Sequence, residues 1–163
     1  MSADIVMRYC GQFLAKLPLG AVAIEDISKI LTLADKPTLA LMYDLALDAG
    51  LTHDEACRRT LPVFLQSCIF YLVEDMVEGG CDYLAFPSSQ GAAAIFTLQQ
   101  LVNLSLHKCA LPESKLVQIS KLFALVGAAQ QQAIQTTAWD LDCAIATAKG
   151  LHGYQFEAYF SII

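Results

Sequence analysis

The stretch that decides the fold is Thr52–Glu78, "THDEACRRTLPVFLQSCIFYLVEDMVE". It opens on a capping box, in which the Thr52 side chain caps the third amide of a helix and Glu55 reaches back to the first. Most of the segment after this box is so apolar that a helix through it must be buried nearly all round. A pair of glycines comes next and is typical of a helix end. We therefore expect a central helix over residues 52–78, kinked or interrupted at Pro62.

The rest of the chain has the same helical periodicity, and neither Asn-Gly nor Asp-Gly, the commonest hairpin turns, occurs in it. The sequence predicts an all-α bundle of about six to seven helices in a single domain over residues 1–163. Proline, glycine and capping residues set the expected bounds. The other expected helices cover residues 3–17, 21–34, 35–50, 88–109, 112–149 and a last segment after 153.

Composition limits the classes of partner. The chain has 163 residues, of which 56% are apolar and only 16% charged, and its net charge is −6. Without a cluster of lysine and arginine it is unsuited to nucleic acid or to an anionic membrane surface. The large apolar fraction indicates helices in a central position, an oligomer interface or a missing half of a larger body.

The six cysteines form no C-x-x-C pair and stand mostly in apolar stretches, which is typical of buried reduced thiols. A cytoplasmic location is therefore expected. The longest strongly apolar run, Leu61–Val73, is 13 residues long and too short to span a bilayer. No signal-peptide pattern begins the sequence.

Three acidic residues end the long apolar helix. Glu74 and Glu78 lie one turn apart on one face, with Asp75 beside them. Like charges at this spacing repel, a cost that a bound cation removes, and Mg²⁺ prefers such carboxylate oxygens. The alternative is a buried helix that has reached solvent and become acidic.

The sequence around this cluster resembles the polyprenyl synthetase family of the isoprenoid synthase fold. "EDMVE" at Glu74–Glu78 is followed by Pro87 and then by "SSQGAAAI" at residues 88–95. In that family an aspartate-rich D-D-x-x-D motif ends the fourth helix, a short loop closes on proline, and the next helix begins near a glycine followed by alanine and an aliphatic residue.

The resemblance implies a helical bundle around an apolar cavity, with Mg²⁺ on the three acidic residues binding an allylic prenyl diphosphate. Phe70, one turn before the motif, would limit the length of the hydrocarbon chain. Lys36 would be the remaining cation of an early diphosphate-binding segment. Gln132, within "QQQAIQ", would stand at the glutamine of a later motif.

Departures from the family pattern favour a second reading. The segment Tyr83–Ala85 stands where the family has Arg-Arg-Gly, and a second aspartate-rich motif would lie beyond residue 163. The chain is thus either a divergent or partial synthase, such as the N-terminal half of a longer protein, or a non-catalytic helical partner subunit. In both readings we expect a homo-oligomer or a hetero-oligomer with a synthase.

Other polar groups carry weaker signals. The acidic pairs Asp44 with Asp48 and Asp140 with Asp142 are interpreted as solvated helix faces. Alternatively, Asp44 and Asp48 face the acidic cluster of Glu74, Asp75 and Glu78 across the bundle, as metal ligands do in a helical NTP pyrophosphatase. The three histidines show no metal-ligand spacing and are expected in surface or capping roles.

Overall fold

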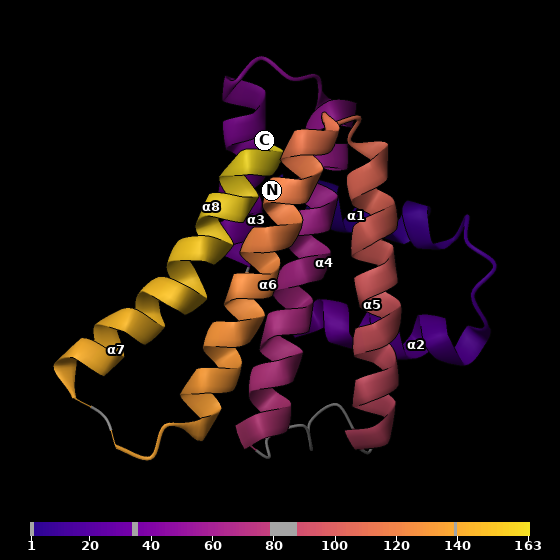
Figure 1. The fold of residues 1–163 in the computed structure, drawn as a ribbon. Helices are drawn as coiled ribbons and strands as arrows, with labels where there is room; N and C mark the ends of the chain where they lie inside the picture. The colour runs from indigo at the N-terminus through magenta and orange to yellow at the C-terminus, as the bar shows by residue number, and fades with distance from the viewer. Residues whose placement is uncertain (1, 34–35, 79–87, 139) are drawn as a thin grey trace. The chain divides into compact units, whose positions relative to one another are not determined.

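The computed structural model describes residues 2–33, 36–78, 88–138 and 140–163, and every regular element in them is helical (Figure 1). The predicted all-α class is confirmed. The elements are α1 (Ser2–Leu14), α2 (Ala21–Ile30), the 3₁₀ helix η1 (Leu31–Leu33), α3 (Lys36–Asp48), α4 (His53–Glu78), α5 (Ser88–Lys108), α6 (Glu113–Gln135), α7 (Leu141–Ala148), the π-helical segment η3 (Lys149–Gly153) and α8 (Tyr154–Ile162).

The chain divides into two compact units, residues 1–110 with α1 to α5 and residues 111–163 with α6 to α8. The expectation of a single domain stays a prediction. Across the described ranges, no helix is both long and apolar enough to cross a membrane.

Helix α4 is the centre of the first unit. It packs against α1, α3 and α5, and α5 runs beside it along its length (Figure 1). Every residue from 60 to 70 is buried, as expected for a helix that is apolar on all sides. Leu65, Cys68 and Leu72 are 0% exposed and form the middle of this core with Leu98 and Val102 of α5.

The start of α4 follows the sequence prediction. The Thr52 amide donates to Glu55 Oε2 over 3.0 Å, and the Glu55 amide donates to Thr52 Oγ1 over 3.3 Å. The Thr52 hydroxyl also donates to Glu55 Oε2 over 2.7 Å, and this bond, followed by the one from the Thr52 amide, is the main reason that the pKa of the Glu55 carboxyl is lowered. Of the kink or interruption predicted at Pro62, the interruption is wrong, because α4 continues through this residue to Glu78, and the kink stays a prediction.

The expected helix over residues 112–149 is also wrong. Helix α6 ends at Gln135, and Thr136 has an extended backbone with ψ of 114°. Asp140 then starts α7 by accepting a hydrogen bond of 2.7 Å from the Cys143 amide. An aspartate whose side chain accepts from an amide three residues later favours a new helix start over a continuous helix. Asp140 is therefore a helix cap rather than half of a functional acidic pair.

The second unit is built on α6 and α8, with the aromatic ring of Tyr159 at its centre. Tyr159 is 0% exposed and meets Phe123 of α6 edge to face at 6.4 Å. Near the start of η3, Gly150 lies so close to α6 that an added Cβ would stand 2.6 Å from Ala129 Cβ. The contact needs a residue without a side chain, which explains the glycine.

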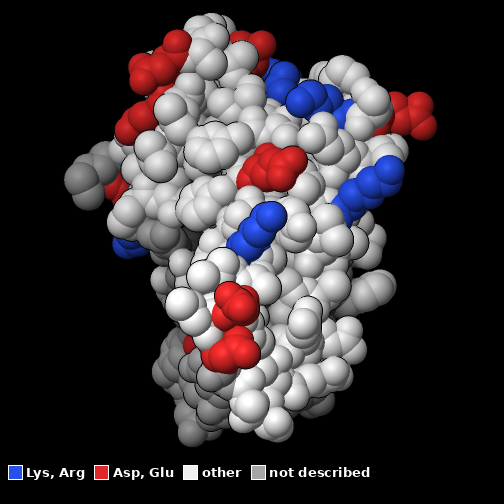
Figure 2. Space-filling model, turned by 60° about the vertical axis from the view of Figure 1, so that its left-hand side comes forward, with Lys and Arg blue, Asp and Glu red and all other residues white. Residues whose placement is uncertain are grey.

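Much of the surface carries no charge. White surface predominates over red and blue on the face shown in Figure 2. Helix α7 has no buried residue, and its Leu141 and Ile145 are 74% and 57% exposed. On α8, Phe160 is 53% exposed and stacks on Phe156. The apolar excess of the composition is thus partly on the surface of the second unit.

Candidate functional site

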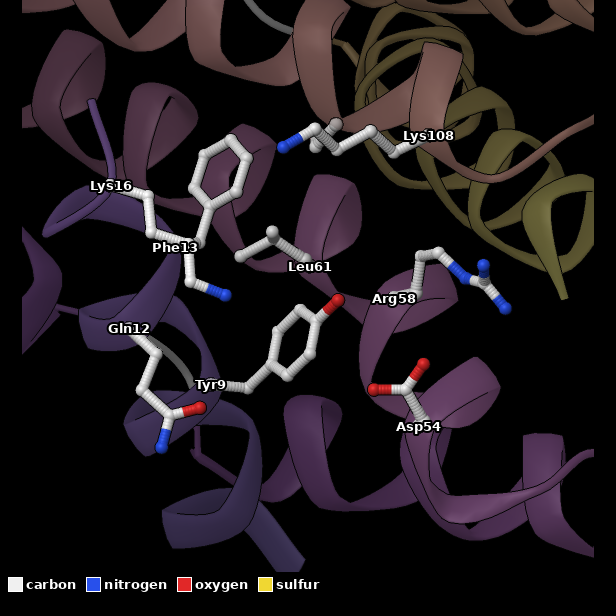
Figure 3. A pocket seen from close by; sticks show the side chains of 9 residues that line it. Tyr9, Gln12, Phe13, Lys16, Asp54, Arg58, Leu61 and Lys108 are labelled. Carbon is white, nitrogen blue, oxygen red and sulfur yellow. The ribbon is translucent and has the colours of Figure 1, made fainter.

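A pocket of about 200 Å³ lies in the first unit between α1, the N-terminal half of α4 and the C-terminal end of α5 (Figure 3). Leu61 and Phe13, which are 2% and 6% exposed, form its apolar wall. Its remaining lining is polar and includes three of the chain's ten lysines and arginines. The lining residues are Tyr9, Gln12, Phe13, Lys16, Asp54, Arg58, Leu61, Ser105 and Lys108.

Two lysines extend along the apolar wall from opposite sides. Lys108 Nζ lies 4.7 Å from the centroid of the Phe13 ring, a cation–π contact between α5 and α1. In Figure 3 the ammonium groups of Lys16 and Lys108 and the hydroxyl of Tyr9 lie on three sides of Leu61. Three hydrogen-bond donors are therefore arranged around Leu61 in this view.

Tyr9 contributes a neutral donor. Burial raises the pKa of its phenol, and the nearby Asp54 carboxylate raises it further. The phenol therefore stays protonated at neutral pH and can donate its O–H to an acceptor in the pocket. Arg58 lowers the pKa of Tyr9 to a smaller extent, so the charges of Asp54 and Arg58 both act on this phenol.

The rim of the pocket holds one anion beside one more cation. In Figure 3 the Asp54 carboxylate lies between Tyr9 and Arg58, one turn before Arg58 on α4. The side chain of Arg58 is 35% exposed, and its Nη2 lies 4.0 Å from Glu55 Oε1. At such exposure this ion pair is weak and leaves the guanidinium able to turn toward a ligand.

A hydrogen bond fixes α5 to α4 beside the pocket. Pro62 has no N–H, so the Arg58 carbonyl four residues earlier lacks its usual helical donor. The thiol of Cys109 instead donates to this oxygen over 3.2 Å, and it also lies 3.3 Å from the Ser105 carbonyl of its own helix. Burial raises the pKa of the Cys109 thiol to about 11, so it stays protonated as this bond requires. The bond holds Lys108 and Arg58 on the same side of the pocket.

The predicted metal ligands lie at the other end of α4. Glu74 and Asp75 are half-buried, and Phe70 one turn earlier is buried at 7% exposure. Glu78 is the last residue of α4, and its side chain lies outside the described part of the structure. Among the described side chains, no group of three or more His, Cys, Asp and Glu lies close enough together to hold a metal ion.

Helix α5 approaches this end of α4 closely. A Cβ added to Gly91 would stand 2.8 Å from Met76 Sδ, so the glycine of "SSQGAAAI" allows the contact. Segments named in the resemblance thus do lie side by side at Met76 and Gly91. The intervening residues 79–87, with Tyr83–Ala85 and Pro87, lie outside the described ranges.

The predicted substrate residues are spread over the chain. Lys36 is exposed at the first position of α3, and Gln132 is exposed on α6 in the second unit. Arg58 and Glu74 are separated by 16 positions of α4, or about 24 Å at the rise of an α-helix. The cationic pocket and the acidic motif are therefore separate places on one helix.

Two other predicted polar groups have structural roles. Asp44 is exposed on α3 and accepts a hydrogen bond of 2.7 Å from Ser2 Oγ, and Asp48 is also exposed, as a solvated face requires. His53 is exposed at the start of α4, and its Nδ1 lies 2.6 Å from the Tyr43 hydroxyl. Its predicted surface role is confirmed.

Searches for relatives identify none: no family model, no curated protein and no solved structure matches this chain. The arrangement of its own side chains is therefore the basis for the functional argument.

Proposed function

We propose that the protein binds a small organic anion in the pocket between α1, α4 and α5. The observation that carries this proposal is the placement of the Lys16 and Lys108 ammonium groups and the Tyr9 hydroxyl around an apolar wall. Donors and cations of this kind bind carboxylate or phosphate oxygens through charge-assisted hydrogen bonds. A neutral apolar ligand would make no use of these charges.

The size of the pocket limits the ligand. A volume of about 200 Å³ is below the range of pockets that hold drug-sized molecules, roughly 300–1,000 Å³. It exceeds the roughly 150 Å³ of a cavity that holds benzene. One ring or a short aliphatic body with one anionic group fits these bounds, its apolar part against Phe13 and Leu61.

Thermal unfolding with benzoate and phenyl phosphate as probes tests the proposal. We expect either probe at millimolar concentration to raise Tm, because a ligand that binds only the folded chain stabilises it. The double variant Lys16→Met with Lys108→Met should lose most of the shift. Lys115→Met is the matched control, since Lys115 is exposed on α6 and does not line the pocket. The absence of any shift in the parent protein with both probes would refute the proposal.

A second candidate function is Mg²⁺-assisted binding of a prenyl diphosphate at Glu74, Asp75 and Glu78. The placement of Glu74 and Asp75 side by side on α4, both half-buried, supports it, because carboxylate oxygens are the ligands that Mg²⁺ prefers and the bound metal can then hold a diphosphate. Mg²⁺ would act as a Lewis acid and neutralise the departing diphosphate.

This candidate has its own test. Mg²⁺ together with a prenyl diphosphate should raise Tm, and Glu74→Ala with Asp75→Ala should abolish the shift. The Lys16 and Lys108 variants should leave it unchanged, because their pocket lies about 24 Å along α4. An unshifted Tm in the parent protein would exclude the candidate.

The alternative of a non-catalytic partner subunit is supported by the exposed Leu141, Ile145 and Phe160 of the second unit. Apolar side chains at such exposure are common in surfaces that assemble. Light scattering alone and in a mixture with a full-length prenyl diphosphate synthase tests it. A monomer under both conditions contradicts the predicted homo- or hetero-oligomer. For the compartment we propose the cytoplasm, because four free cysteines of the described residues are buried thiols.

A further inference from the structure

We propose that the ligand of the pocket is a phosphate monoester with a compact apolar body, and that a simple carboxylate is a weaker ligand of the same site. This inference rests on the proposed anion binding and specifies its chemistry. Two independent features of the pocket point to it, the net charge of the lining and the number of donors.

The charge of the lining matches a dianion. Lys16, Arg58 and Lys108 contribute three positive charges and Asp54 one negative charge, which leaves +2 on the lining itself; Glu55, 4.0 Å from Arg58, lies outside the lining. A phosphate monoester carries about −1.5 to −2 at pH 7, because its second pKa is near 6. A monocarboxylate carries only −1 and leaves one positive charge of the lining uncompensated.

The donors match the terminal oxygens of phosphate. A monoester has three of them, and the Lys16 ammonium, the Lys108 ammonium and the Tyr9 hydroxyl lie on three sides of Leu61. A carboxylate has two oxygens and serves fewer of these donors. Arg58 at the rim adds a fork-shaped group suited to phosphate, and its 35% side-chain exposure leaves it room to turn inward.

The size of the pocket leaves room for a body on the phosphate. Its volume is about 200 Å³, which a phosphate group alone does not fill, and Phe13 and Leu61 are among its lining residues. A ring or short chain esterified to the phosphate occupies the remaining space beside these two side chains. We therefore expect phenyl phosphate to bind more tightly than inorganic phosphate as well as more tightly than benzoate.

A pH comparison separates charge from fit. The ionisable lining groups are Tyr9 of α1, Lys16 just after this helix, Asp54 and Arg58 of α4 and Lys108 of α5, with Glu55 beside Arg58, and none of them is a histidine. Histidine is the side chain that ordinarily titrates between pH 5 and 8. The main change of charge between pH 7.5 and 5.0 is therefore on the phosphate itself.

Calorimetric titration of the full chain with phenyl phosphate, benzoate and inorganic phosphate tests the inference at constant ionic strength. At pH 7.5 we expect phenyl phosphate to bind at least about tenfold more tightly than benzoate, the value of one additional charge-assisted hydrogen bond. At pH 5.0 the ratio should fall to about threefold or less. Tyr9→Phe should weaken phenyl phosphate binding several-fold and benzoate binding less, with the helical circular dichroism unchanged.

The outcomes are distinct. If benzoate binds as tightly as phenyl phosphate at pH 7.5, or if the ratio does not change with pH, the phosphate inference is wrong and anion binding stands. If inorganic phosphate binds as tightly as phenyl phosphate, the requirement for an apolar body is wrong. If none of the three binds, both the inference and the proposed function are wrong.

Discussion

Replacing Cys109 by alanine tests the hydrogen bond that fixes α5 to α4 beside the pocket. Cys109 is 3% exposed, and its thiol donates over 3.2 Å to the Arg58 carbonyl, which Pro62 leaves without a helical donor. Loss of the sulfur atom removes about 1 kcal/mol of packing. Loss of a donor to a part-buried carbonyl adds about 0.5–1 kcal/mol. We expect Cys109→Ala to lower the free energy of unfolding by about 1.5–2 kcal/mol.

A second substitution separates these two contributions. Pro62→Ala restores an N–H four residues after Arg58, and this amide can donate to the same carbonyl as in an ordinary helix. In that background the carbonyl keeps a partner when Cys109 is replaced, and only the packing loss remains. The cost of Cys109→Ala should therefore fall by about 0.5–1 kcal/mol, which is the coupling energy of the two positions.

Urea unfolding of the parent protein, the two single variants and the double variant, followed by circular dichroism at about 222 nm, measures this coupling. Cys10→Ala is the control, because Cys10 is a buried thiol of α1 at 0% exposure and its cost should be the same with and without the Pro62→Ala substitution. Equal costs of Cys109→Ala in both backgrounds would refute the proposed role of the thiol. The same variant should weaken binding of phenyl phosphate, since Lys108 precedes Cys109 directly.

Three further predictions concern local structure. Gly150→Ala should lower stability by about 1–2 kcal/mol in urea unfolding, because its Cβ would stand 2.6 Å from Ala129 Cβ, and its cost should be smaller in an Ala129→Gly background, where that Cβ is absent. Ala110→Gly should raise stability by about 0.5–1 kcal/mol, since Ala110 has φ of 52° after α5, and a lower unfolding midpoint would contradict this. The lowered pKa of Glu55 stabilises the fold above the ordinary glutamate pKa of about 4.3, so Glu55→Gln should reduce Tm at pH 7, and the difference should vanish at acid pH. A difference that persists when the carboxyl is protonated would contradict the assigned role of the capping box.

Sequence was sufficient where a local signal sets the structure. The capping box at Thr52 and Glu55 predicts the start of α4 because its hydrogen bonds are made within four residues. The apolar run after it predicts a helix at the centre of the core, and every residue from 60 to 70 is buried. The break between α6 and α7 also has a local signal, the Asp140 cap, although the pairing of Asp140 with Asp142 suggests a solvated acidic face instead.

The pocket was not predictable in this way. Tyr9, Lys16, Arg58 and Lys108 are spread over about a hundred residues and three helices, and no spacing between them is periodic. Arg58 has only Arg59 as a cationic neighbour in the sequence, and two arginines make no patch along the chain. Folding brings Lys16 and Lys108 to the same pocket as Arg58. The linear motif "EDMVE" predicts a site at the C-terminal end of α4, whereas the pocket lies near the N-terminal end of this helix.

The charge of the whole chain makes the placement of these cations informative. With a net charge of −6, the +2 of the pocket lining leaves −8 for the rest of the protein. At physiological ionic strength the Debye length is about 8 Å, so most of the remote negative charge is screened from an anionic ligand and the groups next to the ligand dominate. Affinity then depends on short charge-assisted hydrogen bonds from the lining of the pocket, beside Phe13 and Leu61. A generally basic surface would bind anions without selecting their shape. Three cations that line one pocket of an otherwise acidic protein instead favour a small anion that fits this pocket.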